Sequence, residues 1–173
     1  RNRTRHIVLQ ELVHEEDLPR DIDACTSYRL VEMAARLKVT FPDRVHVIFG
    51  NHEFAELCDL AIAKHGRELK GLFDTGLQRA YGARWEEVKE AYKAFWRSLP
   101  LALVTPHGAF IAHSTPDLRY MEPLTREYLA GLEPGQDMER KKPPFRLLWG
   151  RDYSPEATEK FAEQIGADRT GLG

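Results

Sequence analysis

Side chains able to bind a metal or carry a proton follow three short apolar runs of this 173-residue chain. They supply carboxylate, amide and imidazole groups, a mixture of oxygen and nitrogen donors that suits first-row divalent metals such as Mn, Fe, Zn and Co. An imidazole at such a position also serves as a general acid or base. The residues concerned are Glu11, His14, Asn51, His52 and His113.

Each of these residues, taken alone, has a structural alternative. Asn and His at strand ends often form turns or satisfied buried hydrogen bonds, and Glu11 by itself is typical of an exposed carboxylate. The sequence Gly50-Asn51-His52-Glu53 is different, because three polar residues directly follow a mainly apolar strand and its glycine. This tetrapeptide therefore favours a functional site.

The sequence pattern around these residues predicts a parallel βαβ unit. Residues 6–13 and 45–49 have the pattern of short buried strands, and residues 26–39 that of a helix. Because consecutive strands joined by a helix are nearly always parallel, their carboxyl ends lie at one edge of the sheet. The helix pattern depends on apolar residues at i, i+3, i+4 and i+7, which are Leu30, Met33, Ala34 and Leu37.

The sequence pattern after residue 53 predicts helices and a hairpin. Residues 54–98 are mainly helical, and 101–104 and 109–112 form a hairpin around Thr105-Pro106-His107-Gly108. Residues 145–149 are predicted to be a short strand. Ser154 and Pro155 suit the N-cap and first position of a last helix, which Gly166 closes. We predict no element after it.

Composition limits the function classes. Apolar residues make up 42% and charged residues 30% of the chain, ordinary values for one globular domain. A formal charge of -2 argues against nucleic-acid binding, and no apolar run approaches the ~20 residues of a membrane helix. The two cysteines are too few for a disulfide framework. We therefore expect a reducing compartment, the cytoplasm, and no membrane partner.

The stretch from Val45 to Glu53 resembles the strand and Gly-Asn-His-Glu motif of calcineurin-like metallophosphoesterases, in particular their serine/threonine phosphoprotein phosphatase branch. Ser98-Leu99-Pro100-Leu101-Ala102 resembles the segment before the family's hairpin. The stretch 110–118 resembles the strand with its His-Gly-Gly motif, although the two residues after His113 differ, and Leu147-Leu148-Trp149-Gly150-Arg151 resembles a later Leu-Trp segment. The resemblance spans roughly residues 7–165.

The resemblance implies an α/β fold, a metallophosphoesterase-like αββα sandwich with parallel βαβ units. We expect residues 1–173 to form a single, incomplete metallophosphoesterase-like domain, with residues 54–98 as a helical cap-like insertion. It also implies a centre of two divalent metals, Mn, Fe, Zn or Co. Asn51 and His113 would bind one metal, Glu11 would stand in place of the aspartate that bridges both, and His52 would be the general acid.

Three functional positions of the family's Gly-Asp-x-Val-Asp-Arg-Gly segment are occupied by other residues here. Glu11 keeps the carboxylate of the bridging aspartate. His14 stands where an aspartate orients the catalytic histidine, and Glu15 stands where an arginine holds the phosphate. Arg151 could supply the missing positive charge; an exposed surface arginine is the alternative.

The family's first motif, Asp-x-His, and its last ones, a Gly-His and a further His, are absent from these residues. We therefore expect the chain to be truncated at both ends and to hold at most one metal, weakly. The predicted function is metal-dependent hydrolysis of a phosphorylated protein or small molecule. The alternatives are a catalytically impaired phosphoesterase-like binding domain, and a phosphodiesterase or nucleotide hydrolase of the same superfamily.

Overall fold

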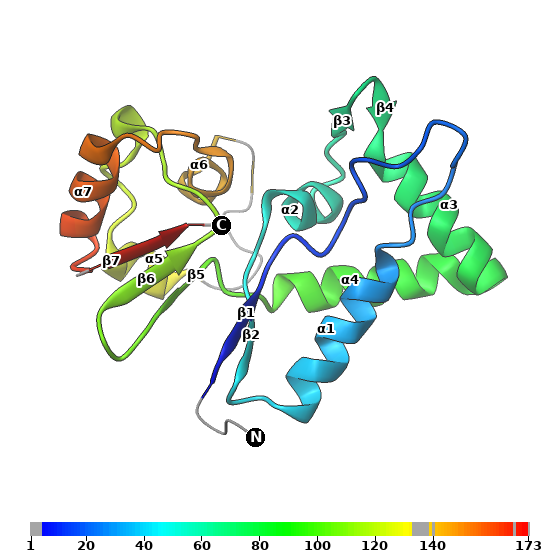
Figure 1. The fold of residues 1–173 in the computed structure, drawn as a ribbon, viewed down its shortest axis with the longest axis horizontal. Coiled ribbons are helices and arrows are strands. Elements are labelled where there is room, and N and C mark those ends of the chain that lie inside the picture. Colours follow the sequence, from blue (N-terminus) through cyan, green and yellow to red (C-terminus); the bar gives the residue numbers. More distant parts are fainter. Residues whose placement is uncertain (1–4, 133–138, 140, 168, 173) are drawn as a thin grey trace. The chain divides into compact units, whose positions relative to one another are not determined.

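The computed structural model describes residues 5–132, 139, 141–167 and the backbone of 169–172. The chain divides into two compact units (Figure 1). The first contains Arg1–Val47 and His52–Arg97, and the second contains Ile48–Asn51 and Ser98–Gly173. We describe each unit by itself.

The first unit begins with the predicted βαβ arrangement. Strand β1 (Ile7–Leu9) pairs in parallel with β2 (Val45–Val47), and α1 (Tyr28–Thr40) connects them. Both strands are shorter than predicted. The first cannot continue through Glu11, because this residue has a φ of 50°, in the left-handed region that an extended strand does not use.

The buried face of α1 differs from the predicted one. Val31 and Ala34 are buried, whereas Leu30 is 46% and Met33 is 53% exposed. The helix packs against β2 and α3 through a face that begins with Ser27 and continues through Val31 and Ala34. Ser27, Val31 and Ala34 also have helical spacing, so spacing alone does not decide which face of the helix is buried.

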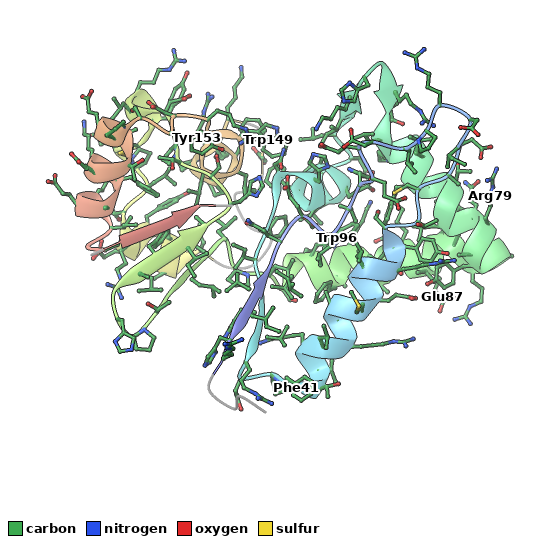
Figure 2. All side chains as sticks on the ribbon, in the orientation of Figure 1. Phe41, Arg79, Glu87, Trp96, Trp149 and Tyr153 are labelled. Carbon is green, nitrogen blue, oxygen red and sulfur yellow. The ribbon has the colours of Figure 1, made fainter. Side chains whose placement is uncertain are left out.

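The rest of this unit is mainly helical, as predicted. It contains α2 (Asn51–Leu57) from His52 onward, α3 (Leu69–Tyr81), the 3-10 turn η1 (Gly82–Arg84) and α4 (Trp85–Arg97). The fully buried Trp96 of α4 is labelled in Figure 2. A small hairpin of β3 (Ala63–Lys64) and β4 (Arg67–Glu68) was not predicted. That residues 54–98 form a cap stays a prediction.

The second unit is built on a three-stranded sheet. The predicted hairpin is confirmed, since β5 (Ala102–Val104) pairs antiparallel with β6 (Ala109–Ala112). Strand β7 (Arg169–Leu172), where no element was predicted, pairs in parallel with β6. The predicted last helix is confirmed as α7 (Pro155–Gln164), and the Ser154 hydroxyl accepts a hydrogen bond from the Ala157 amide at its start.

The prediction of a strand over residues 145–149 was wrong, because α6 (Pro143–Trp149) is a helix. Its two prolines occupy the first helical positions, where proline is well tolerated. Phe145 and Trp149, four residues apart, stack with ring centroids 4.5 Å apart, which requires one helix face. The unit also contains η2 (Leu118–Tyr120) and α5 (Arg126–Gly131).

The core of the second unit lies between its sheet and helices. Phe110 and Phe161 meet edge to face, with ring centroids 5.6 Å apart. Around them lie the other core residues, Ala112, Met121, Leu124, Leu147, Ala157 and Ile165. Across the described part of the chain, no helix is long and apolar enough to span a bilayer.

Gly76 in α3 offers a test of the packing in the first unit. A Cβ atom at this position would lie 1.9 Å from the Cys25 carbonyl oxygen. We expect Gly76→Ala to lower the free energy of unfolding by about 1–3 kcal/mol, because backbone must move to admit the methyl group. Urea denaturation followed by circular dichroism measures this change.

Gly131→Ala is the matched control, since a Cβ atom there has no neighbour within 4 Å. Its unfolding midpoint should not fall. A Gly76→Ala protein as stable as the unsubstituted chain would contradict the close approach of α3 to Cys25.

Candidate functional site

The Gly50–Glu53 motif lies where the chain passes from β2 into α2. Residues 48–50 are buried, and the amide of Phe49 donates to the carbonyl of Pro100 over 2.9 Å. Helix α2 begins at Asn51, so the three polar residues form its first turn and not an open loop. The side chains of Asn51 and His52 are nearly buried, and Glu53 is completely buried.

Glu53 ties this helix to the segment after β1. Its Oε1 accepts hydrogen bonds from the amides of Leu12, over 2.5 Å, and Val13, over 3.3 Å. Desolvation outweighs the effect of these bonds and raises the pKa of Glu53 to about 7. Sequence reasoning noted Glu53 in the motif but gave it no role; a carboxylate followed directly by Phe54 and Ala55 was the available signal.

His14 lies against His52 in the first unit. Their Nδ1 atoms are 3.0 Å apart, and the Nε2 of His14 lies 2.9 Å from Oε1 of Glu56. On the other side, the Nε2 of His52 is 3.3 Å from Oε1 of Glu16. Sequence reasoning selected both histidines but missed the two carboxylates. For Glu56 a signal existed, because it lies four residues after His52 on α2.

The three predicted metal ligands belong to different parts of the chain. Glu11 is an exposed residue of the first unit, whereas Asn51 and His113 belong to the second. His113 follows β6 directly and is 5% exposed. Their convergence into one metal centre stays a prediction. In the described ranges, no three His, Cys, Asp or Glu residues gather in a way that could hold a metal.

Asn51 nevertheless has a feature that fits a cation. Its Oδ1 is buried and has no hydrogen-bond partner among the residues that the structure describes. A buried acceptor without a donor costs about 1–3 kcal/mol, which a metal ion bound to the amide oxygen would offset. Asn51 is thus suited to metal binding.

Arg151 is fixed beside the segment that follows His113. Its Nη1 donates to the hydroxyl of Ser114, over 3.1 Å, and to the carbonyl of Gly150, over 2.6 Å. The residue is otherwise exposed. Whether it binds a phosphate stays a prediction.

Glu15, at the position where a phosphate-binding arginine was expected from the resemblance, has a structural contact. Its carboxylate accepts hydrogen bonds from the amide of Thr26, over 2.6 Å, and from its hydroxyl, over 3.1 Å. Glu15 therefore holds the loop before α1 and brings no positive charge.

The comparison with solved structures shows the fold: the chain has an α/β fold that is also found in a serine/threonine phosphatase. It superimposes with a TM-score of 0.61 on a protein serine/threonine phosphatase from Saccharomyces cerevisiae with similarity to human phosphatase PP5. The two are 17% identical, and the match covers 84% of this chain and 46% of that one.

In sequence, the chain is 25% identical over 147 residues to a probable serine/threonine-protein phosphatase from Encephalitozoon cuniculi. That match covers 76% of this chain and 30% of the relative. The predicted resemblance to this phosphatase branch is confirmed. The chain spans less than half the length of either protein. No protein-family profile matches it.

The raised pKa of Glu53 predicts that the free energy of unfolding depends on pH. Because its folded pKa of about 7 lies above the ordinary 4.5, its contribution to stability is complete below pH 4.5 and is lost as the pH rises through 7. The loss amounts to about 3 kcal/mol. Glu53→Gln removes this titration. The unfolding free energy of the variant minus that of the unsubstituted chain should therefore increase from pH 5 to pH 8, because only the unsubstituted chain loses stability over this range.

Urea denaturation of both proteins at these two pH values makes the measurement. Other titrating groups cancel in the difference between the two proteins. A difference that is equal at both pH values would show that Glu53 is ionised in the folded protein throughout.

Proposed function

We propose that this chain is part of a metal-dependent phosphoester hydrolase in which His52 is the general acid. The observation that carries the proposal is the setting of His52, a nearly buried imidazole hydrogen-bonded at Nδ1 to His14. The preceding residue, Asn51, has a buried amide oxygen without a partner within the described residues. The sequence match to a probable serine/threonine-protein phosphatase supports the same class.

Asn51 and His113 would bind the metal, and Glu11 would complete or bridge the centre. Two divalent ions, Mn, Fe, Zn or Co, belong to the complete enzyme in this proposal. Such ions, when bound, neutralise phosphoryl oxygens and activate water as the nucleophile. In this proposal the chain by itself keeps at most one ion, because the Asp-x-His and Gly-His motifs that the resemblance implies are absent from its sequence.

The chain's own contribution to the reaction is proton transfer. Cleavage of the ester leaves negative charge on the departing oxygen, which a proton from His52 neutralises. The N–H bond of the ring breaks, an O–H bond forms on the alcohol, and His52 is left as a neutral imidazole. His14 fixes the ring during this step, and Arg151 would pair with the phosphate.

The first substrate class is a phosphorylated protein, and a phosphorylated small molecule is the second. A location in the cytoplasm and the absence of nucleic-acid and membrane partners remain part of the proposal. One observation favours a catalytically impaired binding domain instead: Glu15 is engaged with Thr26, and no cation replaces the expected arginine at its position.

Metal binding tests the ligand assignment. Titration of the purified 173-residue chain with Mn²⁺, followed by calorimetry, should show at most one weakly bound equivalent. Asn51→Ala should weaken that binding further, because it removes the amide oxygen. Two tightly bound equivalents would mean that the assigned ligands are wrong.

Turnover tests the general acid. In the full-length protein with Mn²⁺, His52→Ala should lower kcat on a phosphoserine peptide by about 10²–10⁴-fold. The loss on p-nitrophenyl phosphate should be smaller, because nitrophenolate departs without needing a proton. His107→Ala, at an exposed turn histidine, is the control and should keep full activity.

An equal loss on both substrates would contradict the role of His52 as acid. A full-length protein inactive on both would favour the binding domain. Faster turnover of bis-p-nitrophenyl phosphate than of the monoester would assign a phosphodiesterase.

A further inference from the structure

We infer that Glu56 is a positioning residue for His52 and acts through His14. This inference deepens the proposed function, and its catalytic consequence rests on it. Glu56 and His14 have side-chain exposures of 0% and 1%, so the contact between them is shielded from water. All of the groups involved belong to the first unit.

The direction of the first hydrogen bond follows from chemistry. A carboxylate only accepts, so across the 2.9 Å from Nε2 of His14 to Oε1 of Glu56 the imidazole must donate. Neutral His14 then carries its hydrogen on Nε2 and offers Nδ1 as an acceptor. Glu56 thereby selects the tautomer of His14.

The second hydrogen bond makes the tautomer of His52 depend on the tautomer of His14. The two Nδ1 atoms are 3.0 Å apart, and since that of His14 accepts, that of His52 must donate. His52 therefore keeps a hydrogen on Nδ1 in both of its charge states. Its Nε2, which lies 3.3 Å from Oε1 of Glu16, is the nitrogen left to carry the transferable proton.

The surroundings hold this chain of side chains in place. Phe73 packs edge-on against His14, with ring centroids 5.7 Å apart and planes at 84°. Lys89 lies 3.3 Å from the second oxygen of Glu56 and also pairs with Asp74. The cation of Lys89 offsets the cost of burying the Glu56 carboxylate. Glu56 is thus held toward His14 with its charge balanced.

No proton needs to reach Glu56 during the reaction. His52 gives up the hydrogen on Nε2, becomes neutral and keeps the one on Nδ1, so the hydrogen bonds to His14 and Glu56 are the same before and after transfer. Glu56 consequently fixes orientation and tautomer and does not touch the substrate.

Long-range ¹H–¹⁵N spectra of the histidine rings test the inference without any activity. At about pH 8, above the usual histidine pKa, the unsubstituted 173-residue chain should show His14 protonated on Nε2 and His52 on Nδ1. In Glu56→Gln, the amide oxygen turns toward Lys89 and the amide NH₂ toward His14. The hydrogens should then move to Nδ1 of His14 and Nε2 of His52.

Glu90→Gln, an exposed carboxylate on α4, is the matched control and should leave both rings unchanged. If Glu56→Gln does not fold, Glu56→Asp keeps the charge beside Lys89 and shortens the reach toward His14, and both tautomers should then be populated. A spectrum of either folded variant identical to that of the unsubstituted chain would overturn the inference.

A second arm uses the full-length protein with Mn²⁺ and a phosphoserine peptide. Glu56→Gln should lower kcat by about 10–100-fold with little change in KM, and Glu56→Asp should recover part of the loss. Unchanged kcat together with a switched tautomer would overturn the positioning role. If instead His52→Ala is also fully active, the proposed function itself fails.

Discussion

Two buried carboxylates on one short helix determine the arrangement of the candidate site in the first unit. Glu53 and Glu56 lie three residues apart on α2, and both are completely buried. A carboxylate is costly to bury unless it is paired, so each side chain must find donors. Glu53 finds them in the backbone after β1 and Glu56 in His14. Because both partners belong to the segment that also contains Glu11, the helix and this segment hold one another in place.

The parts of the fold that were predicted correctly are those that local patterns encode. Apolar runs indicated the βαβ unit and the β5–β6 hairpin, and the abrupt polarity after Gly50 indicated the motif. Ser154, Pro155 and Gly166, which suit the two ends of a helix, indicated α7. The strand predicted over residues 145–149 failed because apolar runs this short suit a strand or a buried helix equally. Glu56 and Glu16 were missed for another reason. The spacing of Glu56 from His52 placed it on the same helix face, but its contact with His14 and that of Glu16 with His52 join residues far apart in the chain, which spacing does not encode.

The electrostatic setting of His52 differs from the one that the resemblance implies. There, an aspartate would contact the imidazole and an arginine would stand nearby. Here a second imidazole makes the contact, and the carboxylates of Glu16 and Glu56 lie at the two ends of the pair. Lys64 in turn pairs with Glu16. The carboxylates of Glu16 and Glu56 do not attract a phosphate, because carboxylate and phosphate carry charge of the same sign. In the proposed function, phosphate binding therefore depends on the metal or on Arg151.

Strand β7 has a consequence for how the second unit assembles. In the parallel pairing of β7 with β6, Ala109 is the register partner of Arg169. The residues between these two positions form one long loop, whose closure costs conformational entropy. The β5–β6 hairpin needs only its own turn and can form early, whereas β7 is synthesised after both strands of the hairpin. Until β7 pairs with β6, one edge of β6 has unpaired backbone amides and carbonyls that can bind another extended chain. During synthesis this unit is thus exposed to aggregation for longer than its finished sheet suggests.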